Sequence, residues 1–165
     1  LENGGIHDQV FKYLNCSKPT AEILDPACVV DLGDGFRPIH LWYNRLKWKE
    51  ERNRQFPGSE KFWSLCSFIH KSNWEFASQH PILPIASWWD FKQSFNALQP
   101  RNYLTGLLLS SSINDLLSIC SCANDQRLKK FLDLQLQLYS QQLSDKTAAL
   151  YGATVLQIAQ EPYGL

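Results

Sequence analysis

The sequence contains no methionine, no excess of either charge and no long apolar run. Its 165 residues carry 16 basic and 16 acidic side chains, so the formal charge is zero. A protein that binds the phosphate backbone of nucleic acid needs a basic excess, and the charge balance therefore argues against nucleic acid as a partner. The sequence also lacks a signal-peptide pattern and the run of about 20 apolar residues that a transmembrane helix needs. Because a reading frame starts with methionine, we expect this chain to be a segment of a longer protein.

The five cysteines show no recognisable pattern. An odd number at irregular spacing does not indicate a disulfide framework. Cys120 and Cys122 are too close together for the usual zinc-binding pair, and further ligands would have to come from His40, His70 or His80. We expect reduced, mostly buried thiols of a cytosolic protein, with a metal site as the alternative.

Motifs for nucleotide binding and nucleophilic catalysis are also missing. Gly33-Asp34-Gly35 lacks the third glycine and the following helix of a dinucleotide-binding fingerprint. The sequence contains no Gly-x-Ser-x-Gly element, and its four histidines are scattered. Glu50 and Glu51 lie in a charged stretch, and we expect both to face water. No residue is therefore assigned a catalytic, cofactor-binding or metal-binding role.

The pattern of apolar residues predicts an α+β fold that is predominantly α. A β-hairpin is expected at residues 28–42, with Gly33-Asp34-Gly35 in its turn. Pro38 cannot donate a ladder hydrogen bond, so its strand should lie at the edge of a sheet completed by missing sequence. Six or seven helices should make up the rest of a single segment, residues 1–165. The sequence offers eight candidate starts for these helices, near Ile6, Asn44, Ser59, Ser87, Pro100, Ser112, Asn124 and Ser144, and the last helix is expected to run from Thr147 to Gln160.

Uncharged stretches and tryptophans are the most unusual features of the sequence. Residues 76–89, 102–114 and 147–160 contain no Lys, Arg, Asp or Glu, and all six tryptophans lie within residues 42–89. Tightly packed helices would explain both features. Indoles also suit hydrocarbon tunnels and membrane interfaces, because one end of the ring system is apolar and the other is polar. The basic stretch from Arg45 to Lys61, which contains Trp48, favours a membrane surface.

Four segments of the sequence share a pattern with one known family: 24–35 (LDPACVVDLGDG), 55–63 (QFPGSEKFW), 125–132 (DQRLKKFL) and 148–153 (AALYGA). They resemble the phytoene dehydrogenase-like flavoproteins, the family of carotenoid desaturases and isomerases. The first is similar to a hairpin of that family, the second to its Phe-Pro-Gly helix start, the third to a later helix and the fourth to the stretch before its Gly-Gly motif. The four occur in the family's order, and the resemblance extends from about Cys16 to Leu165.

The resemblance implies a role for this chain within a larger enzyme. In that family an FAD-binding domain flanks a mostly helical substrate domain, which shelters a long polyene and meets the membrane. The chain matches that substrate-binding (cap) domain and lacks the FAD-binding domain. It is therefore expected to be inactive alone, to bind no FAD by itself, and to lie peripherally at the cytoplasmic side of a membrane. Residues expected to line the site of the carotenoid-like substrate are Trp63, Trp74, Trp88, Trp89, Phe91 and Leu107.

Two alternatives do not involve redox chemistry. A helical protein-interaction module would use the same aromatic side chains to bind a partner helix. A carrier would use them to solubilise an apolar ligand.

Overall fold

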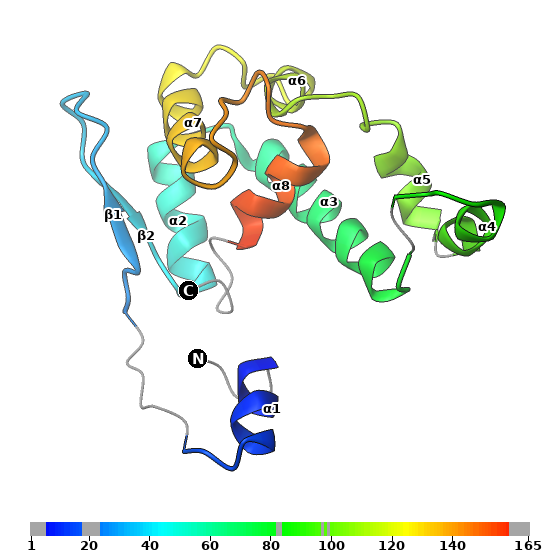
Figure 1. The fold of residues 1–165 in the computed structure, drawn as a ribbon. Helices are drawn as coiled ribbons and strands as arrows, with labels where there is room; N and C mark the ends of the chain where they lie inside the picture. The colour runs from blue at the N-terminus through cyan, green and yellow to red at the C-terminus, as the bar shows by residue number, and fades with distance from the viewer. Residues whose placement is uncertain (1–5, 18–23, 82–83, 97, 99, 159–165) are drawn as a thin grey trace. The chain divides into compact units, whose positions relative to one another are not determined.

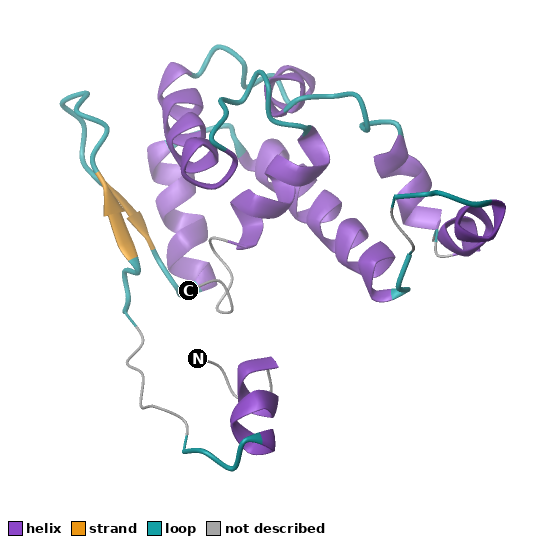
Figure 2. Cartoon of the chain, viewed as in Figure 1, coloured by secondary structure: helices purple, strands orange, loops and turns teal. Residues whose placement is uncertain are grey.

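The computed structural model describes residues 6–17, 24–81, 84–96, 98 and 100–158. The chain divides into unit 1, residues 1–55 and 158–165, and unit 2, residues 56–157. In the described residues helices predominate, and the strands form one two-stranded sheet (Figure 1, Figure 2). The predicted fold class, predominantly α with a short β-hairpin, is confirmed.

Unit 1 contains helix α1 (Ile6–Tyr13), strands β1 (Cys28–Val30) and β2 (Ile39–Leu41), and helix α2 (Arg45–Gln55). The strands are antiparallel, with Cys28 opposite Leu41 and Val30 opposite Ile39. Helix α2 begins directly after Asn44, whose side-chain oxygen accepts hydrogen bonds from the N–H groups of Leu46 and Lys47 at 2.9 and 3.2 Å. The predicted helix start near Asn44 thus coincides with a capping residue.

The loop of the hairpin is longer than the sequence suggests. Gly33 and Gly35 both have positive φ, 63° and 78°, as expected for glycines in a turn. The carboxylates of Asp31 and Asp34 accept hydrogen bonds from the N–H groups two residues further on. A hairpin at residues 28–42 with only Gly33-Asp34-Gly35 in its turn is therefore wrong in its bounds: residues 31–38, including Pro38, form the loop, and β2 begins at Ile39.

Glu51 of α2 is buried, with a side chain that is 2% exposed, and the prediction that it faces water is wrong. One oxygen accepts hydrogen bonds from Gln55 Nε2 at 2.8 Å and from the backbone N–H of His40 at 3.4 Å, and the other contacts the Arg54 guanidinium. Trp48, one helical turn earlier, is buried on the same side. Because α2 packs against β2, Glu51 connects the helix to the hairpin.

Glu51 should make the stability of the protein depend on pH. Burial raises the pKa of its carboxyl, but hydrogen bonds from Gln55 and His40 and the charge of Arg54 outweigh this and lower the pKa below its usual value of 4.5. A lowered pKa stabilises the fold above pH about 4.5, and this contribution disappears as the pH falls through the folded-state pKa.

We therefore expect Glu51→Gln to destabilise the protein at pH 7 by roughly 1–2 kcal/mol and to flatten the loss of stability below pH about 5. Denaturant unfolding between pH 3 and pH 7 measures both effects. The control is Glu50→Gln at the neighbouring exposed position, which should behave like wild type. Equal pH profiles for the two variants would contradict this role of Glu51.

The named elements in the described residues of unit 2 are all helices. Its elements are α3 (Glu60–Ser78), α4 (Trp88–Asn96), α5 (Pro100–Gly106), α6 (Ile113–Ile119), α7 (Gln126–Ser140) and α8 (Ala149–Ile158). Ser112 and Asp115 form a capping box at the predicted start of α6, through reciprocal hydrogen bonds of 3.2 and 2.7 Å. Asp125 caps α7 by accepting a 2.9 Å hydrogen bond from the N–H of Leu128.

The last helix starts later than predicted. Ser144 and Asp145 do not cap it, because the N–H of Ser144 donates to the Asp133 carboxylate at 2.7 Å and residues 144–146 form a turn. Strand-like pairing of Ser112 with Ala148 then leads into α8 at Ala149. The predicted helix end at Gln160 lies outside the described residues.

The core of unit 2 lies among α3, α6, α7 and α8. Phe56 and Phe131 are both fully buried, with ring centroids 5.2 Å apart. Other fully buried side chains come from these four helices: Phe62, Cys66, Ile69, Ile113, Leu116, Leu117, Leu128, Leu132, Leu136 and Ala153. Asn73 of α3 donates to the Leu150 carbonyl at 2.9 Å and to Thr154 Oγ1 at 2.8 Å, which fixes α8 against α3.

Gly152 lets α8 approach the start of α6 closely. A Cβ atom at this position would lie 2.5 Å from Cγ1 of Ile113 and 3.0 Å from Cγ2 of Thr147. Ile113 is fully buried and has little room to move. We expect Gly152→Ala to destabilise the protein by about 1–3 kcal/mol because it overpacks this contact.

Thermal or denaturant unfolding tests this expectation. Gly106→Ala is the matched control, since Gly106 is also helical and no atom lies within 4 Å of its Cβ position. The control should leave stability unchanged or raise it by up to about 1 kcal/mol. A stable Gly152→Ala protein would show that α6 and α8 can separate without cost.

Candidate apolar ligand surface

Helix α4 turns its polar side inward and its aromatic side outward. Ser94 is buried, and Asp90 and Gln93 are partly buried. Trp88, Phe91 and Phe95 form a ladder along the exposed side, with stacked ring centroids 5.3 and 6.0 Å apart. An ordinary surface helix has the opposite arrangement, so this helix presents an apolar face that its own unit does not cover.

The first turn of α4 holds this orientation. The Asp90 carboxylate accepts hydrogen bonds from the N–H groups of Ala86 and Ser87 at 3.1 and 2.8 Å, and Ser87 Oγ accepts from the N–H of Asp90 at 3.2 Å. The Ser87 hydroxyl, followed by these two N–H groups, lowers the pKa of Asp90 despite some desolvation. Ser87 is therefore the N-cap that the sequence predicts, and Asp90 completes a capping box.

Helix α5 has the same inverted arrangement. Its inward side chains are Asn102 and Thr105, which join Ser72 of α3 in a buried network. Asn102 Nδ2 donates to the carbonyl and the hydroxyl of Ser72 at 2.9 and 2.8 Å, and the hydroxyls of Ser72 and Thr105 are 3.0 Å apart. Because α5 uses polar groups to pack on α3, its apolar side chains Tyr103 and Leu104 face outward.

The network predicts a stability cost for removing its central amide. Asn102→Ala leaves the Ser72 carbonyl and hydroxyl without that donor, so we expect a loss of about 1–3 kcal/mol. Unfolding by urea measures the change. Asn96→Ala, at an exposed helical position of α4, should change stability by less than about 0.5 kcal/mol. If both substitutions were neutral, another contact would have to hold α5 on α3.

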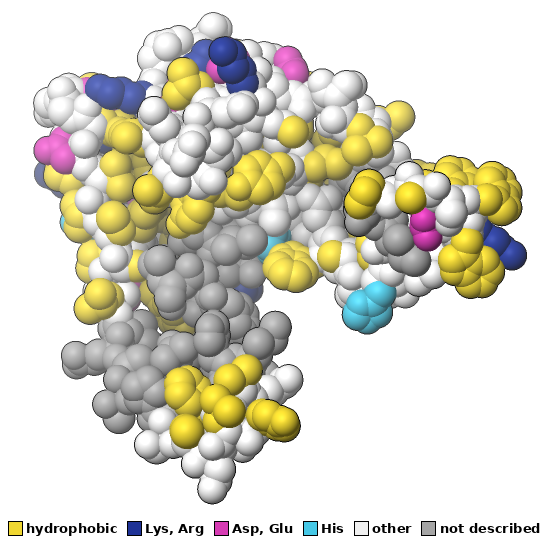
Figure 3. All heavy atoms as spheres, in the orientation of Figure 1, with side chains coloured by type: hydrophobic (Ala, Val, Ile, Leu, Met, Phe, Trp, Pro, Cys, Tyr) yellow, Lys and Arg dark blue, Asp and Glu magenta, His cyan; other side chains and the backbone are white. Residues whose placement is uncertain are grey.

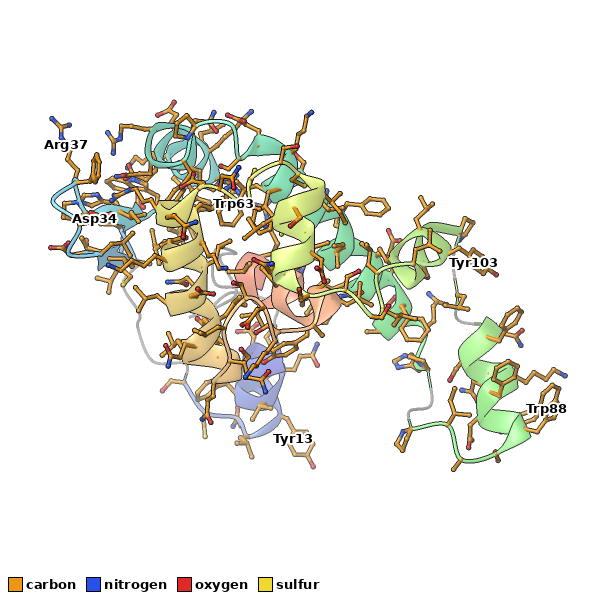
Figure 4. All side chains as sticks on the ribbon, turned by 90° about the horizontal axis from the view of Figure 1, so that it is seen from above. Tyr13, Asp34, Arg37, Trp63, Trp88 and Tyr103 are labelled. Carbon is orange, nitrogen blue, oxygen red and sulfur yellow. The ribbon has the colours of Figure 1, made fainter. Side chains whose placement is uncertain are left out.

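We call the resulting apolar region the inverted surface. Among residues 84–110 with described side chains, every buried residue is polar, whereas nine large apolar residues are exposed. Figure 3 shows hydrophobic side chains gathered over α4, and Figure 4 shows Trp88 and Tyr103 on the outer sides of α4 and α5. The inverted surface comprises these nine residues and Trp74 at the end of α3: Trp74, Ile85, Trp88, Trp89, Phe91, Phe95, Tyr103, Leu104, Leu107 and Leu109.

Five of the six predicted lining residues belong to the inverted surface. Trp74 and Phe91 are about half exposed, while Trp88, Trp89 and Leu107 are more than two-thirds exposed. Trp63 differs, because it is buried and its indole N–H donates to Ser59 Oγ at 3.1 Å. The structure therefore places Trp63 in the core, apart from the other five.

The inverted surface includes residues that sequence reasoning did not select. Phe95, Tyr103 and Leu104 are all exposed, next to predicted lining residues. One feature of the sequence could have identified them. Asn102 and Thr105 are three residues apart in an uncharged stretch, so on a short helix they lie on the same side. If that polar side faces inward, Tyr103 and Leu104 must face outward.

The basic helix α2 does not supply the tryptophan expected at a membrane surface. Trp48 is buried, and the Arg52 guanidinium lies 5.4 Å from its ring centroid. Trp42 is partly exposed, stacks on His40 and lies 4.8 Å from Lys47 Nζ. Within unit 1 these indoles serve local packing. In the described residues, no helix has both the length and the apolar character needed to cross a membrane.

The thiols do not form a metal centre with other side chains in the described part of the chain. No group of three His, Cys, Asp or Glu residues there is arranged to hold a metal ion. None of the five cysteines, which all lie in the described residues, forms a disulfide, and Cys66, Cys120 and Cys122 are buried. Burial raises the pKa of Cys120 and Cys122, which keeps both thiols protonated and unreactive at neutral pH.

Comparisons of the chain with protein-family models, with curated proteins and with solved structures return no match.

Proposed function

We propose that the chain is the substrate-binding region of an FAD-dependent, phytoene dehydrogenase-like oxidoreductase of carotenoid biosynthesis. In this proposal it shelters a long apolar polyene beside a flavin that another domain of the same parent protein binds. The observation that carries the proposal is the inverted surface, in which the segment from Trp74 to Leu109 exposes ten large apolar side chains. A surface of this kind in a folded protein indicates an apolar partner.

The composition of the inverted surface suits a hydrocarbon. Leu104, Leu107 and Leu109 offer aliphatic contacts, while Trp74 and Tyr103 offer ring faces. Burying hydrocarbon contributes about 25 cal/mol per Å², so a long polyene gains affinity along its whole length without polar contacts. The Ser72–Asn102–Thr105 network supports this role because it holds α5 in one position on α3. A fixed α5 would set the register of the chain of double bonds.

The redox chemistry belongs to the proposed partner domain. A bound flavin supplies hydride transfer, and the residues of this chain orient the polyene and exclude water from it. The sequence resemblance supports this division, because the four matched segments all fall in the substrate region of that family. In the described residues β1 and β2 form a two-stranded sheet, and because α2 occupies the outer edge of β2, the edge of β1 is the one suited to extend a sheet in the rest of the parent protein.

A peripheral membrane location at the cytoplasmic side is part of the proposal. A long polyene is insoluble in water and partitions into bilayers. If the apolar surface that receives the polyene lies at the membrane, the substrate can pass from the bilayer to the protein without crossing water.

Leu107→Asp tests the polyene site. We expect this substitution to weaken binding of methyl parinarate, a conjugated tetraene, by about tenfold or more, because it places a charge at the apolar contact. The increase in probe fluorescence on binding reports the affinity. The matched control is Leu138→Asp on α7, because Leu107 and Leu138 are similarly exposed, 79% and 74%.

Equal affinity in wild type and both variants would contradict the assignment of the surface. The flavoenzyme part of the proposal is tested separately by expressing the full-length parent protein and recording its absorbance spectrum. We expect the absorbance bands of a protein-bound flavin. A parent protein that binds methyl parinarate but carries no flavin would instead identify a carrier.

A further inference from the structure

We infer that α4 is the element by which this protein docks on an anionic lipid bilayer, lying in the interfacial plane with its aromatic ladder inserted. This inference deepens the peripheral membrane location proposed above and names the residues that produce it. It commits α4 to the bilayer and leaves Leu104, Leu107 and Tyr103 of the α5 region to the polyene.

The outer side of α4 has the residue distribution of an interfacial helix. At 100° per residue, Phe91, Phe95 and Trp88 lie within about 60° of one another, and Trp89 lies about 100° beyond Trp88. Lys92 lies between Trp88 and Trp89 on this projection and is exposed. Indoles therefore flank a cation, and the lysine can extend its ammonium group to lipid phosphates while its methylene groups stay among the rings.

The acidic and the basic residue of α4 lie on different sides of the helix, with the basic one on the aromatic side. Its one acid, Asp90, accepts hydrogen bonds from Ala86 and Ser87 at the helix start and is partly buried. At 100° per residue Asp90 also lies about 160° from Lys92, so the side of α4 that bears the aromatic ladder carries the positive charge of Lys92 and no carboxylate of α4. This distribution is complementary to anionic headgroups.

The breadth of the exposed sector favours a bilayer over the other apolar partners. The aromatic residues and Lys92 together cover about 160° of the helix circumference. A polyene is a thin rod and would cover one ridge of this sector. A protein partner would cover it at the cost of desolvating the Lys92 ammonium, whereas a bilayer interface accepts both rings and cation.

Vesicle binding by the chain tests the inference. The probes are vesicles of phosphatidylcholine alone and of phosphatidylcholine with phosphatidylglycerol, and the readouts are co-sedimentation and the blue shift of tryptophan fluorescence. We expect tighter binding to the anionic vesicles. Trp88→Ala combined with Trp89→Ala should weaken partitioning by at least about tenfold, because each large side chain loses its apolar burial.

Two control substitutions separate α4 from general effects. Phe36→Ala removes an exposed aromatic ring of the hairpin loop, outside the inverted surface, and should leave partitioning within about twofold of wild type. Lys92→Glu should weaken binding to the anionic vesicles alone, whereas Lys130→Glu on α7, which removes the same charge from another exposed site, should not. Circular dichroism and melting temperature confirm that each variant is folded.

The outcomes distinguish this inference from the proposed function. Unchanged vesicle binding by the Trp88/Trp89 variant, or no binding by wild type, overturns the role of α4. Loss of methyl parinarate binding on Leu107→Asp in the same protein would still support the polyene site. Conversely, if the protein bound vesicles through α4 but bound no polyene, the membrane role of α4 would be supported and the proposed polyene-binding function would be contradicted.

Discussion

Polar contacts in the interior determine which side of α5 faces outward. Asn102 and Thr105 satisfy their hydrogen-bonding groups on Ser72 of α3, and a helix of seven residues has room for few other inward positions. Burial of these polar groups is favourable only with their partners in place, so the contact leaves the helix little freedom to rotate. Tyr103 and Leu104 are therefore left on the exposed side of the helix. The exposed apolar surface is a direct consequence of the polar interior of this region.

A comparable principle operates in unit 1. Glu51 is buried between α2 and β2, where it accepts hydrogen bonds from the backbone of His40 and from Gln55. Leucine at this position would leave the His40 N–H and Gln55 amide without their acceptor. In both units a polar group that accepts or donates several hydrogen bonds positions one element on another, and apolar packing by itself would tolerate more than one arrangement.

The two kinds of helix in unit 2 suggest two different tasks. Helices α3, α6, α7 and α8 bury a continuous apolar core that includes the Phe56–Phe131 pair. Helices α4 and α5 contribute no large apolar side chain to the buried set in their described residues. The first group provides stability. The second group presents a hydrocarbon-like surface, as proposed for a protein that takes a polyene from a bilayer.

Local features of the sequence determined where most elements begin. Asn44, Ser87, Ser112 and Asp125 precede helices because their short polar side chains accept hydrogen bonds from the first free N–H groups. Such contacts involve residues two or three positions apart and can be predicted without knowledge of the fold. The late start of α8 was not predictable in this way, because Ser144 is bound to Asp133 of α7, eleven residues away.

The side to which each aromatic residue turns was decided by the tertiary structure. Trp63 and Trp88 both occur in apolar helical stretches, yet Trp63 is buried against Ser59 and Trp88 is 78% exposed. Composition predicted an apolar-rich helical protein with a surface for hydrocarbon or membrane. Which residues form that surface depended on long-range polar partners, since hydrogen bonds between α3 and α5 join residues about thirty positions apart and leave no periodic signal in the sequence.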